Sequence, residues 1–413
     1  MRKKCEPMFF RGKGTTLRIA VVGVSLMVAS CSPSGSASSA APSVAQFGAS
    51  SRRHVVEPSA CQRKKNPFLI GANVVDIDDS EDKNLENDGL RGYGSKKGRQ
   101  VLTRLRAMGA NSLVLPVDIY VEKKGAALTF ISSPLTTSKG QLRLRMMIRQ
   151  AKEKELQVML VPHLQLSDGT WRGDLSPPSI EDFLEQYLVA IGPILQIAEE
   201  ECADAFSFAV EFKAMATRQD VRPAFALFIA QLRNRFSGTL SYSANWDEAA
   251  YVSFWPLLDV IGINAFFPLA TSIDDSEVQI RTRVRMILKD MTRLSNLHQR
   301  PLVWWEVGYK ATANALVQPW AWPVDGSKEP TLDVKTQLMA YDIIFSEMKT
   351  HSIPSTSSPL APGPLAGLHV WMIPSDLRDV VHPWRFEPES GFSILNKPSE
   401  ARFSMFAKSM FAK

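Results

Sequence analysis

The sequence predicts an α/β fold, a (β/α)8 TIM barrel that occupies residues 66–413. This region is about 350 residues long, which is normal for such a barrel with its loops. Short apolar runs alternate with amphipathic stretches, as expected when parallel strands are connected by helices. The alternation repeats over eight cycles, which favours a closed barrel over an open, doubly wound sheet.

Eight short apolar runs are candidates for the strands. Several are continuous and rich in Val, Ile and Leu, which is typical of parallel strands covered on both faces. In chain order they are residues 68–73, 112–118, 157–163, 205–211, 239–245, 260–264, 302–306 and 368–371. In this fold the catalytic residues lie at the carboxyl ends of the strands.

Amphipathic stretches between these runs predict the helices. Residues 98–108 place four apolar side chains on one face, and Gly109 supplies a C-terminal stop. Ser179 is a candidate N-cap of a helix over 180–199. The other predicted helices are 142–155, 223–236, 277–297, 332–349 and 399–411.

Residues 1–30 are predicted to be a lipoprotein signal peptide. Basic residues precede a short apolar run at 19–28, and small residues then lead to Cys31. The run is too short to span a bilayer comfortably. Residues 28–31, Val-Ala-Ser-Cys, resemble a bacterial lipobox, in which Cys31 is lipidated and becomes the mature N-terminus. An ordinary secretory signal with a cysteine there by chance is the alternative.

The lipidated Cys31 and a disordered tether rich in Ser and Ala are expected over residues 31–65, because this composition cannot bury a core. The protein is thus expected to be an exported bacterial lipoprotein with a membrane anchor, at the outer membrane and periplasm or at the cell surface. Ser32 rather than Asp follows Cys31, which in a Gram-negative cell favours sorting to the outer membrane.

The charge gives no reason to expect a nucleic-acid partner. The whole chain has a net charge of +6, but most of this excess lies in the first thirty residues, so the remainder carries about +1. The sequence has no basic stripe interleaved with aromatic residues. We expect a monomer.

Cysteines and acidic residues give no metal or cofactor prediction. Cys61 and Cys202 remain after export, and a disulfide between them is permitted but not indicated by their spacing, so two free thiols stay an alternative. The acidic run at 76–82 resembles a calcium loop only weakly, because Glu81 stands where the turn glycine belongs. The histidines are scattered without metal-ligand spacing. We therefore expect neither a metal nor a cofactor.

Two predicted strands end in a glutamate, Glu211 on the fourth and Glu306 on the seventh. Acids rarely enter buried strands unless they are paired or used. Glycoside hydrolysis needs two carboxyl groups that flank the scissile bond, and their separation distinguishes retaining from inverting enzymes. The alternative is that one of the two glutamates makes a structural salt bridge, for instance with Lys213 or an arginine.

The other strand ends are polar or aromatic. Asn, Asp and His side chains can bind sugar hydroxyls, and aromatic rings stack on the apolar faces of sugars. From their positions we predict that Asn264 and Trp371, after the sixth and eighth strands, bind substrate. The remaining strand-end residues are Asn73, Asp118, His163, Asn245, Trp246 and Asp247, and nearby loops add Trp171, Arg172, Trp320, Trp322 and Trp384.

The order of motifs resembles glycoside hydrolase family 113, the β-1,4-mannanase-type TIM barrels of a large retaining clan. The most specific matching motifs are Asp-Gly-Thr-Trp-Arg-Gly at 168–173 and Ala-Asn-Trp-Asp at 244–247. The resemblance implies a double displacement on a β-mannan-like polysaccharide, with Glu211 as acid/base and Glu306 as nucleophile. It also implies that His163, Trp171, Asn245 and Trp246 line the sugar subsites.

Two residues depart from the family pattern. Val210 precedes Glu211 where the clan usually has a polar residue, and Phe266 stands where the family tends to have a tyrosine near the nucleophile. Losing that hydroxyl removes a hydrogen bond that could tune the nucleophile. Two alternatives follow: a glycan-binding envelope lipoprotein with weakened or lost activity, and an anchored scaffold in envelope assembly.

Overall fold

The computed structural model describes residues 61–63, 66, 68–76, 92–124, 127–132, 137–321, 331–352, 365–376 and 389–411 of the 413-residue chain. The predicted signal peptide, Cys31 and the tether up to residue 60 lie outside these residues. So do Glu81 with the rest of the acidic run after Asp76, and the two loop tryptophans Trp322 and Trp384.

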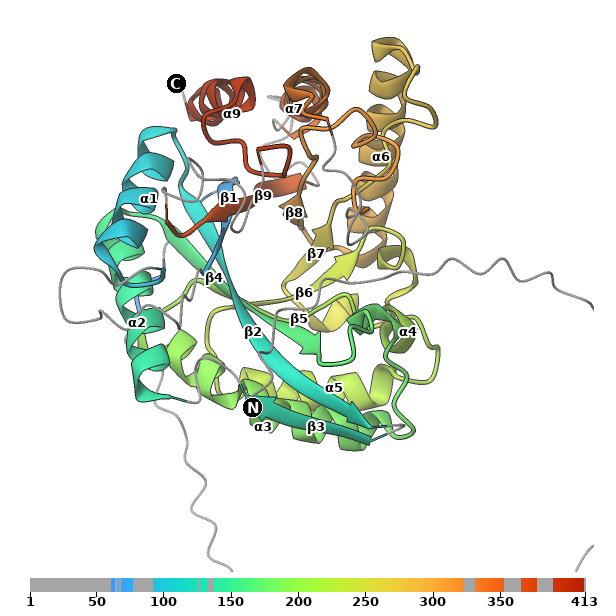
Figure 1. The fold of residues 1–413 in the computed structure, drawn as a ribbon. Coiled ribbons are helices and arrows are strands. Elements are labelled where there is room, and N and C mark those ends of the chain that lie inside the picture. The colour runs from blue at the N-terminus through green and yellow to red at the C-terminus, as the bar shows by residue number, and fades with distance from the viewer. Residues whose placement is uncertain are drawn as a thin grey trace, which may run out of the picture. The chain divides into compact units, whose positions relative to one another are not determined.

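Eight parallel strands close into a barrel, which confirms the predicted TIM barrel (Figure 1). β1 pairs with both β9 and β2, so the sheet has no free edge within the barrel. All eight predicted strands are present. They are β1 (Leu69–Val75), β2 (Ser112–Lys124), β4 (Gln157–Leu166), β5 (Ala205–Val210), β6 (Thr239–Asn245), β7 (Val260–Asn264), β8 (Leu302–Val307) and β9 (Leu365–Pro374).

One further strand, β3 (Ala127–Ser132), was not predicted. It pairs antiparallel with the end of β2, and β2 also stays in register with β4 as far as Val121 opposite Leu166. The β2–β3 hairpin therefore extends the sheet beyond the carboxyl end of the barrel, next to β4.

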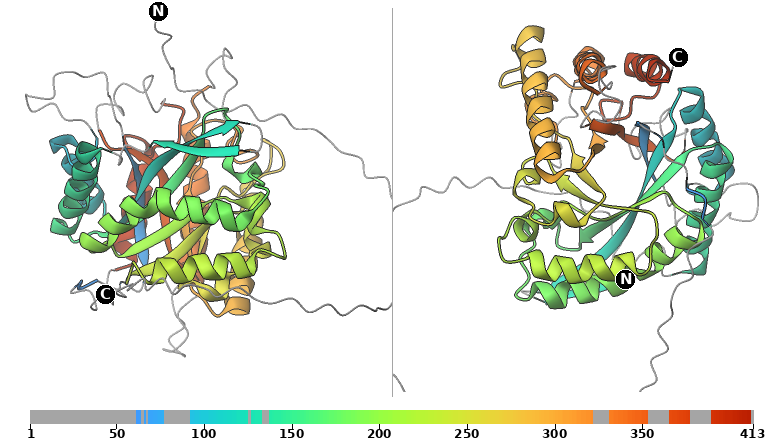
Figure 2. Two further views of the ribbon diagram at one scale, coloured as in Figure 1. Left: turned by 90° about the horizontal axis from the view of Figure 1, so that it is seen from below. Right: turned by 180° about the vertical axis from the view of Figure 1, so that it is seen from behind.

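Helices surround the strands (Figures 1 and 2). All seven predicted helices are present, with ends shifted by a few residues, and Ser179 caps its helix by accepting a hydrogen bond from Asp182 N at 3.1 Å. They are α1 (Lys96–Ala107), α2 (Ser138–Glu153), α3 (Ile180–Glu200), α5 (Arg222–Arg233), α6 (Glu277–His298), α7 (Val334–Ser352) and α9 (Pro398–Ser409). A short helix, α4 (Lys213–Ala216), follows β5 directly.

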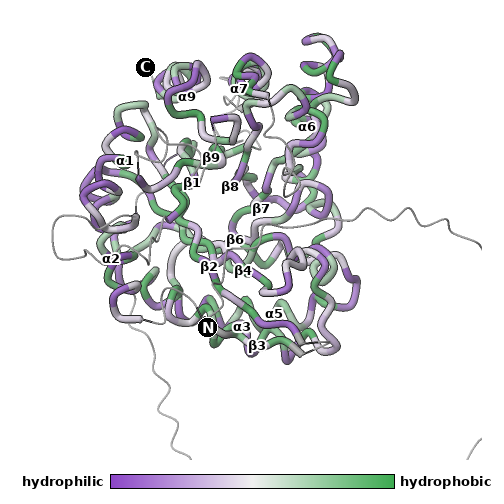
Figure 3. The backbone as a smooth tube through the Cα atoms, viewed as in Figure 1, coloured by the Kyte–Doolittle hydropathy of each residue, from purple (hydrophilic) through white to green (hydrophobic). Residues whose placement is uncertain are grey.

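The core has two main parts. The larger cluster packs the outer faces of the strands against the helices. The strands are accordingly mainly hydrophobic, whereas hydrophobic and hydrophilic residues alternate along the helices (Figure 3). A smaller cluster of residues from β2, β4, β5 and β8, including Val210 and Trp305, forms a separate buried core. Among the described residues no helix is long and apolar enough to cross a membrane.

The segment before β1 is attached at the amino ends of the strands. Cys61 and Cys202 form a disulfide with their Cα atoms 5.4 Å apart, a pairing that the sequence left open. Arg63 donates hydrogen bonds to Ala203 O at 2.7 Å and to Ser237 Oγ at 2.6 Å. Residues 202, 203 and 237 precede β5 and β6, so this attachment lies at the rim opposite to the strand ends that carry Glu211 and Asn245.

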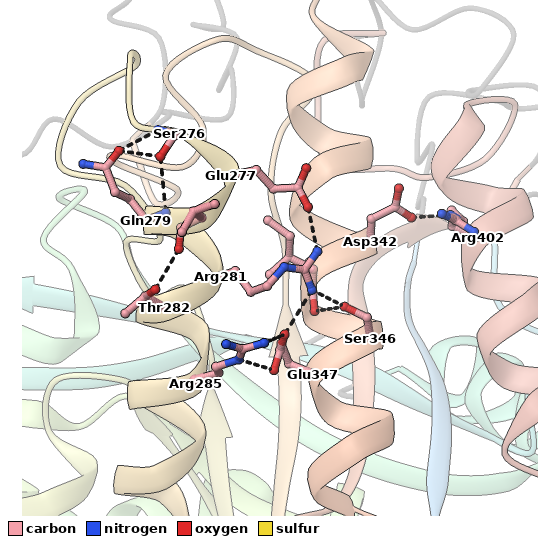
Figure 4. A network of polar contacts seen from close by, with 12 residues as sticks. Ser276, Glu277, Gln279, Arg281, Thr282, Arg285, Asp342, Ser346, Glu347 and Arg402 are labelled. Carbon is pink, nitrogen blue, oxygen red and sulfur yellow. Dashed lines mark hydrogen bonds and ion pairs between the residues drawn. The ribbon is translucent and has the colours of Figure 1, made fainter.

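Ion pairs connect the last three long helices (Figure 4). Glu347 on α7 accepts hydrogen bonds from Arg281 at 3.0 Å and from Arg285 at 2.8 Å, both on α6. Asp342 on α7 pairs with Arg402 on α9. These contacts join α7 to the helices on either side of it.

Candidate active site

The two predicted glutamates lie at the carboxyl ends of the fourth and seventh barrel strands. Glu211 directly follows β5, and Glu306 is part of β8 opposite Asn264 of β7. Their exposed fractions are only 6% and 4%. Glu211 has a φ of 55°, in the left-handed region, which costs a residue with a Cβ atom about 1–2 kcal/mol. Surrounding contacts must therefore hold it.

Three donors hold the carboxylate of Glu211. Its Oε2 accepts hydrogen bonds from Trp171 Nε1 at 3.2 Å and from Arg172 NH2 at 3.0 Å. Its Oε1 accepts one from Asn264 Nδ2 at 3.0 Å. Trp171 and Arg172 belong to the Asp-Gly-Thr-Trp-Arg-Gly motif, so this motif contacts Glu211 directly.

Burial raises the pKa of Glu306 well above its ordinary value, and the negative charge of Glu211 raises it further. The charge of Arg172 and the polar amide of the neighbouring Asn264 act in the opposite direction. Asn264, hydrogen bonded to Glu211 and opposite Glu306 in register, lies between the two glutamates, and the two carboxyls interact electrostatically. Two interacting buried carboxyls resist being charged together, so this pair is suited to sharing one proton.

His163 lies beside Glu306, with its Nε2 atom 3.5 Å from Oε1. Burial, followed by the charge of Arg172, lowers the pKa of His163 to about 4, so the imidazole is neutral at physiological pH and this contact is not an ion pair. The imidazole stacks on Trp371 with ring centroids 5.8 Å apart and planes 5° from parallel. The peptide bond after Trp371 is cis.

Asn245 and Trp246 lie one strand further along the rim, where Asn245 is opposite Asn264 in the register of β6 and β7. In the described part of the chain neither is hydrogen bonded to a glutamate. Asn245 Oδ1 accepts from Trp246 N at 2.9 Å and so shapes its own turn. Trp246 stacks on Trp320, whose side chain is 46% exposed, with centroids 5.7 Å apart. The two rings form an aromatic platform.

The residues that depart from the family pattern are apolar in their surroundings as well. Val210 is fully buried in the cluster that includes Val161 and Trp305. Phe266 packs against Met372 and Phe392. His163 Nε2 lies 3.5 Å from Glu306 Oε1 but has no hydrogen-bond partner among the described residues, so it does not replace the hydrogen bond that a tyrosine hydroxyl would donate.

Some contacts of Glu211 could not be read from the sequence. Arg172 belongs to the motif at 168–173, but nothing in its spacing points to Glu211 as its partner. Tyr242 and Glu248 are buried polar residues behind Glu211, and only their three-dimensional contacts reveal them. Of the salt-bridge partners considered for Glu211, Lys213 instead pairs with Asp247, whereas an arginine, Arg172, does form an ion pair with Glu211 at 3.0 Å.

Of the strand-end residues without a predicted role, Asn73 donates to the backbone oxygen of Trp305 at 2.8 Å and so links β1 to β8. Asp118 accepts from Gln165 at 3.0 Å. Within the described residues, no group of three or more His, Cys, Asp or Glu side chains could hold a metal ion.

The chain matches the model of glycoside hydrolase family 113 over residues 88–353, a range that contains both glutamates. No curated protein is significantly similar to it in sequence. A solved β-mannanase of this family from Alicyclobacillus acidocaldarius, in complex with ManMIm, is 20% identical, with a TM-score of 0.65 over 84% of this chain and 98% of that one. A second solved β-1,4-mannanase of the family is 18% identical, with a TM-score of 0.63 over 83% and 100%.

Proposed function

Because this chain belongs to glycoside hydrolase family 113 and is therefore a glycosidase by family, we propose that it cleaves β-mannan-like polysaccharide with retention, using Glu211 and Glu306. One observation carries the proposal: two buried glutamates from strands four and seven interact at the carboxyl rim on either side of Asn264, which is hydrogen bonded to Glu211 and opposite Glu306 in register. Two acids at this rim suit a reaction that needs both around one bond.

In the proposed mechanism, Glu306 attacks the anomeric carbon while Glu211 protonates the leaving oxygen. A glycosyl-enzyme intermediate forms on Glu306. Glu211, now a carboxylate, removes a proton from a water molecule, and the water oxygen attacks the anomeric carbon. The bond to Glu306 breaks, and the sugar leaves with its original configuration. The reaction requires one proton on the pair, and the mutual repulsion of the two carboxyls favours a single proton. In the site without substrate, burial and the three donors to Glu211 favour that proton on Glu306, so the proposed mechanism requires its transfer to Glu211 when the sugar binds.

The aromatic residues support a polysaccharide as substrate. Trp371, stacked on His163, offers a ring beside the nucleophile, and the platform of Trp246 and Trp320 offers a second site at some distance from it. Trp320 is half exposed, so a chain of several sugars could lie over it. The two solved β-1,4-mannanases named above make β-mannan the first polymer to test.

Hydrolysis of mannan, glucomannan and peptidoglycan-like glycans by the wild type, Glu211→Gln and Glu306→Gln tests this function. We expect turnover by the wild type, a loss of at least about 10³-fold in both variants, and initial products of retained anomeric configuration by NMR. With an activated aryl glycoside as substrate, added azide should restore turnover to variants that lack the carboxyl group of Glu306 or of Glu211. No wild-type turnover on any glycan, with binding retained in both variants, would leave only a glycan-binding protein.

We further propose that the enzyme is an exported monomeric lipoprotein anchored through Cys31. The Cys61–Cys202 disulfide supports export, because such bonds persist in oxidising compartments. Wild-type cells fed labelled palmitate should yield labelled protein in the membrane fraction, and Cys31→Ser should abolish both the label and the membrane association. A labelled Cys31→Ser protein would contradict the anchor.

A further inference from the structure

A third carboxyl lies buried behind Glu211. Glu248, in the turn after β6, is fully buried, and its Oε1 accepts a hydrogen bond from the Tyr242 hydroxyl at 2.5 Å. The same hydroxyl accepts from the backbone N–H of Phe212 at 2.7 Å. Phe212 is the residue that follows Glu211, so a chain of two hydrogen bonds runs from Glu248 to the backbone beside the proposed acid/base.

Glu248 is kept uncharged by its surroundings. Burial raises its pKa to about 8; the hydrogen bond from Tyr242 opposes this rise, and the negative charges of Glu211 and Asp247 add to it. Its Oε2 has no partner within the described part of the chain. A buried carboxyl held in this way is unfavourable for folding and is found preferentially where it serves a function.

The contacts of this turn converge on three consecutive residues. Glu211 N donates to Ser243 O at 2.8 Å, Phe212 N donates to Tyr242 Oη, and Lys213 Nζ pairs with Asp247. Residues 211, 212 and 213 are thus each fixed to the 242–247 segment. This is the stretch where the backbone takes the left-handed turn at Glu211 that aims the carboxyl into the barrel mouth.

We propose that Tyr242 and Glu248 are positioning residues for proton donation by Glu211. Glu248 orients the Tyr242 hydroxyl, the hydroxyl fixes the Phe212 N–H, and this contact keeps the backbone turn at Glu211 in the orientation in which its carboxyl reaches the leaving oxygen. The inference rests on the proposed acid/base role of Glu211, and neither residue touches the sugar.

Comparing substrates with different leaving groups distinguishes a role in proton donation from a general structural role. A sugar or alkyl leaving group needs protonation, whereas dinitrophenolate leaves without it. Tyr242→Phe should therefore lower kcat/KM for a mannooligosaccharide by roughly 10- to 100-fold, a fraction of a full general-acid contribution, and should change kcat/KM for the dinitrophenyl glycoside less than about threefold. Glu211→Gln should show the same pattern in stronger form.

Tyr187→Phe is the matched control. The Tyr187 hydroxyl is also buried and donates to a backbone oxygen of β5, that of Phe208 at 2.7 Å. The Tyr187 ring packs against Phe212, a contact that phenylalanine keeps, and among the described residues its hydroxyl is not hydrogen bonded to residues 211–213. We expect its loss to affect both substrates to the same extent. Equal losses on both substrates in Tyr242→Phe, or none, would overturn the proposal.

Glu248 provides a second test. Glu248→Gln keeps an oxygen that can accept from Tyr242 and should retain the wild-type ratio of the two kcat/KM values. Glu248→Leu removes the acceptor and should show the leaving-group pattern of Tyr242→Phe. Should Glu248→Leu fail to fold, Tyr242→Phe decides alone. An inactive wild type would refute the proposed function itself, whereas an active wild type with an unselective Tyr242→Phe would refute only this inference.

Discussion

Asn264 lies next to both glutamates of the site. Its amide donates to Glu211 at 3.0 Å and lowers the pKa of Glu306, which is opposite it in the register of β7 and β8, while its Oδ1 is buried without a partner among the described residues. A side chain shared in this way sets the relative orientation of both carboxyls before a sugar arrives. It also places an unused acceptor at the centre of the site, where a sugar hydroxyl could donate to it.

Replacing Asn264 with Ala should therefore impair the chemical step more than binding. We expect kcat to fall by about 10²-fold, within the range seen when a preorganised polar contact is lost, with a smaller change in KM. Steady-state kinetics on a mannooligosaccharide measure both constants, and thermal unfolding checks that the fold persists. A variant with normal kcat and raised KM alone would mean that Asn264 only binds sugar.

Glu248 should make stability depend on pH. The carboxyl has a pKa near 4.5 in the unfolded chain and about 8 in the folded protein. Between these values the unfolded state has lost a proton that the folded state keeps, so the free energy of unfolding decreases as pH rises from about 4.5 to 8. At 1.36 kcal/mol per pKa unit, the decrease is at most about 5 kcal/mol.

Glu248→Gln removes this proton-linked decrease. Urea unfolding at pH 5 and pH 8 should show that the variant gains stability relative to the wild type at the higher pH. The same difference between the two proteins at both pH values would show that Glu248 does not carry the shifted pKa.

At the level of elements, α7 is joined to α6 through one buried acid. The carboxylate of Glu347 has 6% of its side chain exposed and accepts from Arg281 and Arg285 (Figure 4). Burial by itself would raise its pKa, but the hydrogen bonds from the two arginines outweigh this effect and leave the pKa below its ordinary value. The ionised form is therefore the one that joins the helices.

Glu347→Gln should lower the free energy of unfolding by about 1–3 kcal/mol, because three charge-assisted hydrogen bonds from two arginines weaken at a buried position. Glu277→Gln is the matched control. Glu277 pairs with the same Arg281, but its side chain is 59% exposed, and an exposed pair contributes roughly 0–1 kcal/mol. Urea titration of both variants measures the difference. Equal effects would mean that burial of Glu347 adds nothing.

Over the whole molecule, features encoded locally could be predicted and features created by distant contacts could not. The eight barrel strands were predictable because each is a continuous apolar run. β3 was missed because its alternating residues pair with the extension of β2 rather than with the barrel core. α2 begins at Ser138 rather than 142 because its first turn is polar and carries no apolar face.

The site divides in the same way. Glu211 and Glu306 stood out as acids at the ends of apolar runs, where a charge is unexpected. Tyr242 and Glu248 did not, and Arg172 stood out only as part of a motif, because each acquires its role from a partner that the fold brings close. The pairing of Cys61 with Cys202 is of this kind too, since their separation of 141 residues carries no information about contact.

That disulfide supports a prediction for the whole molecule. It joins the segment before β1 to the end of α3, and it closes a loop that contains three of the barrel strands, β1, β2 and β4, so it restricts the unfolded chain strongly. Exchanging both cysteines for serine should lower the free energy of unfolding by about 2–4 kcal/mol. Arg63 would still hold the segment through Ala203 and Ser237, so the barrel should keep its activity below the melting temperature.

Thermal unfolding with and without a reducing agent measures this effect. The wild type should lose stability on reduction, the double serine variant should be insensitive to the reductant, and the two reduced proteins should melt at similar temperatures. A wild-type melting temperature that does not respond to complete reduction, verified by thiol titration of the unfolded protein, would show that the bond between Cys61 and Cys202 does not stabilise the barrel.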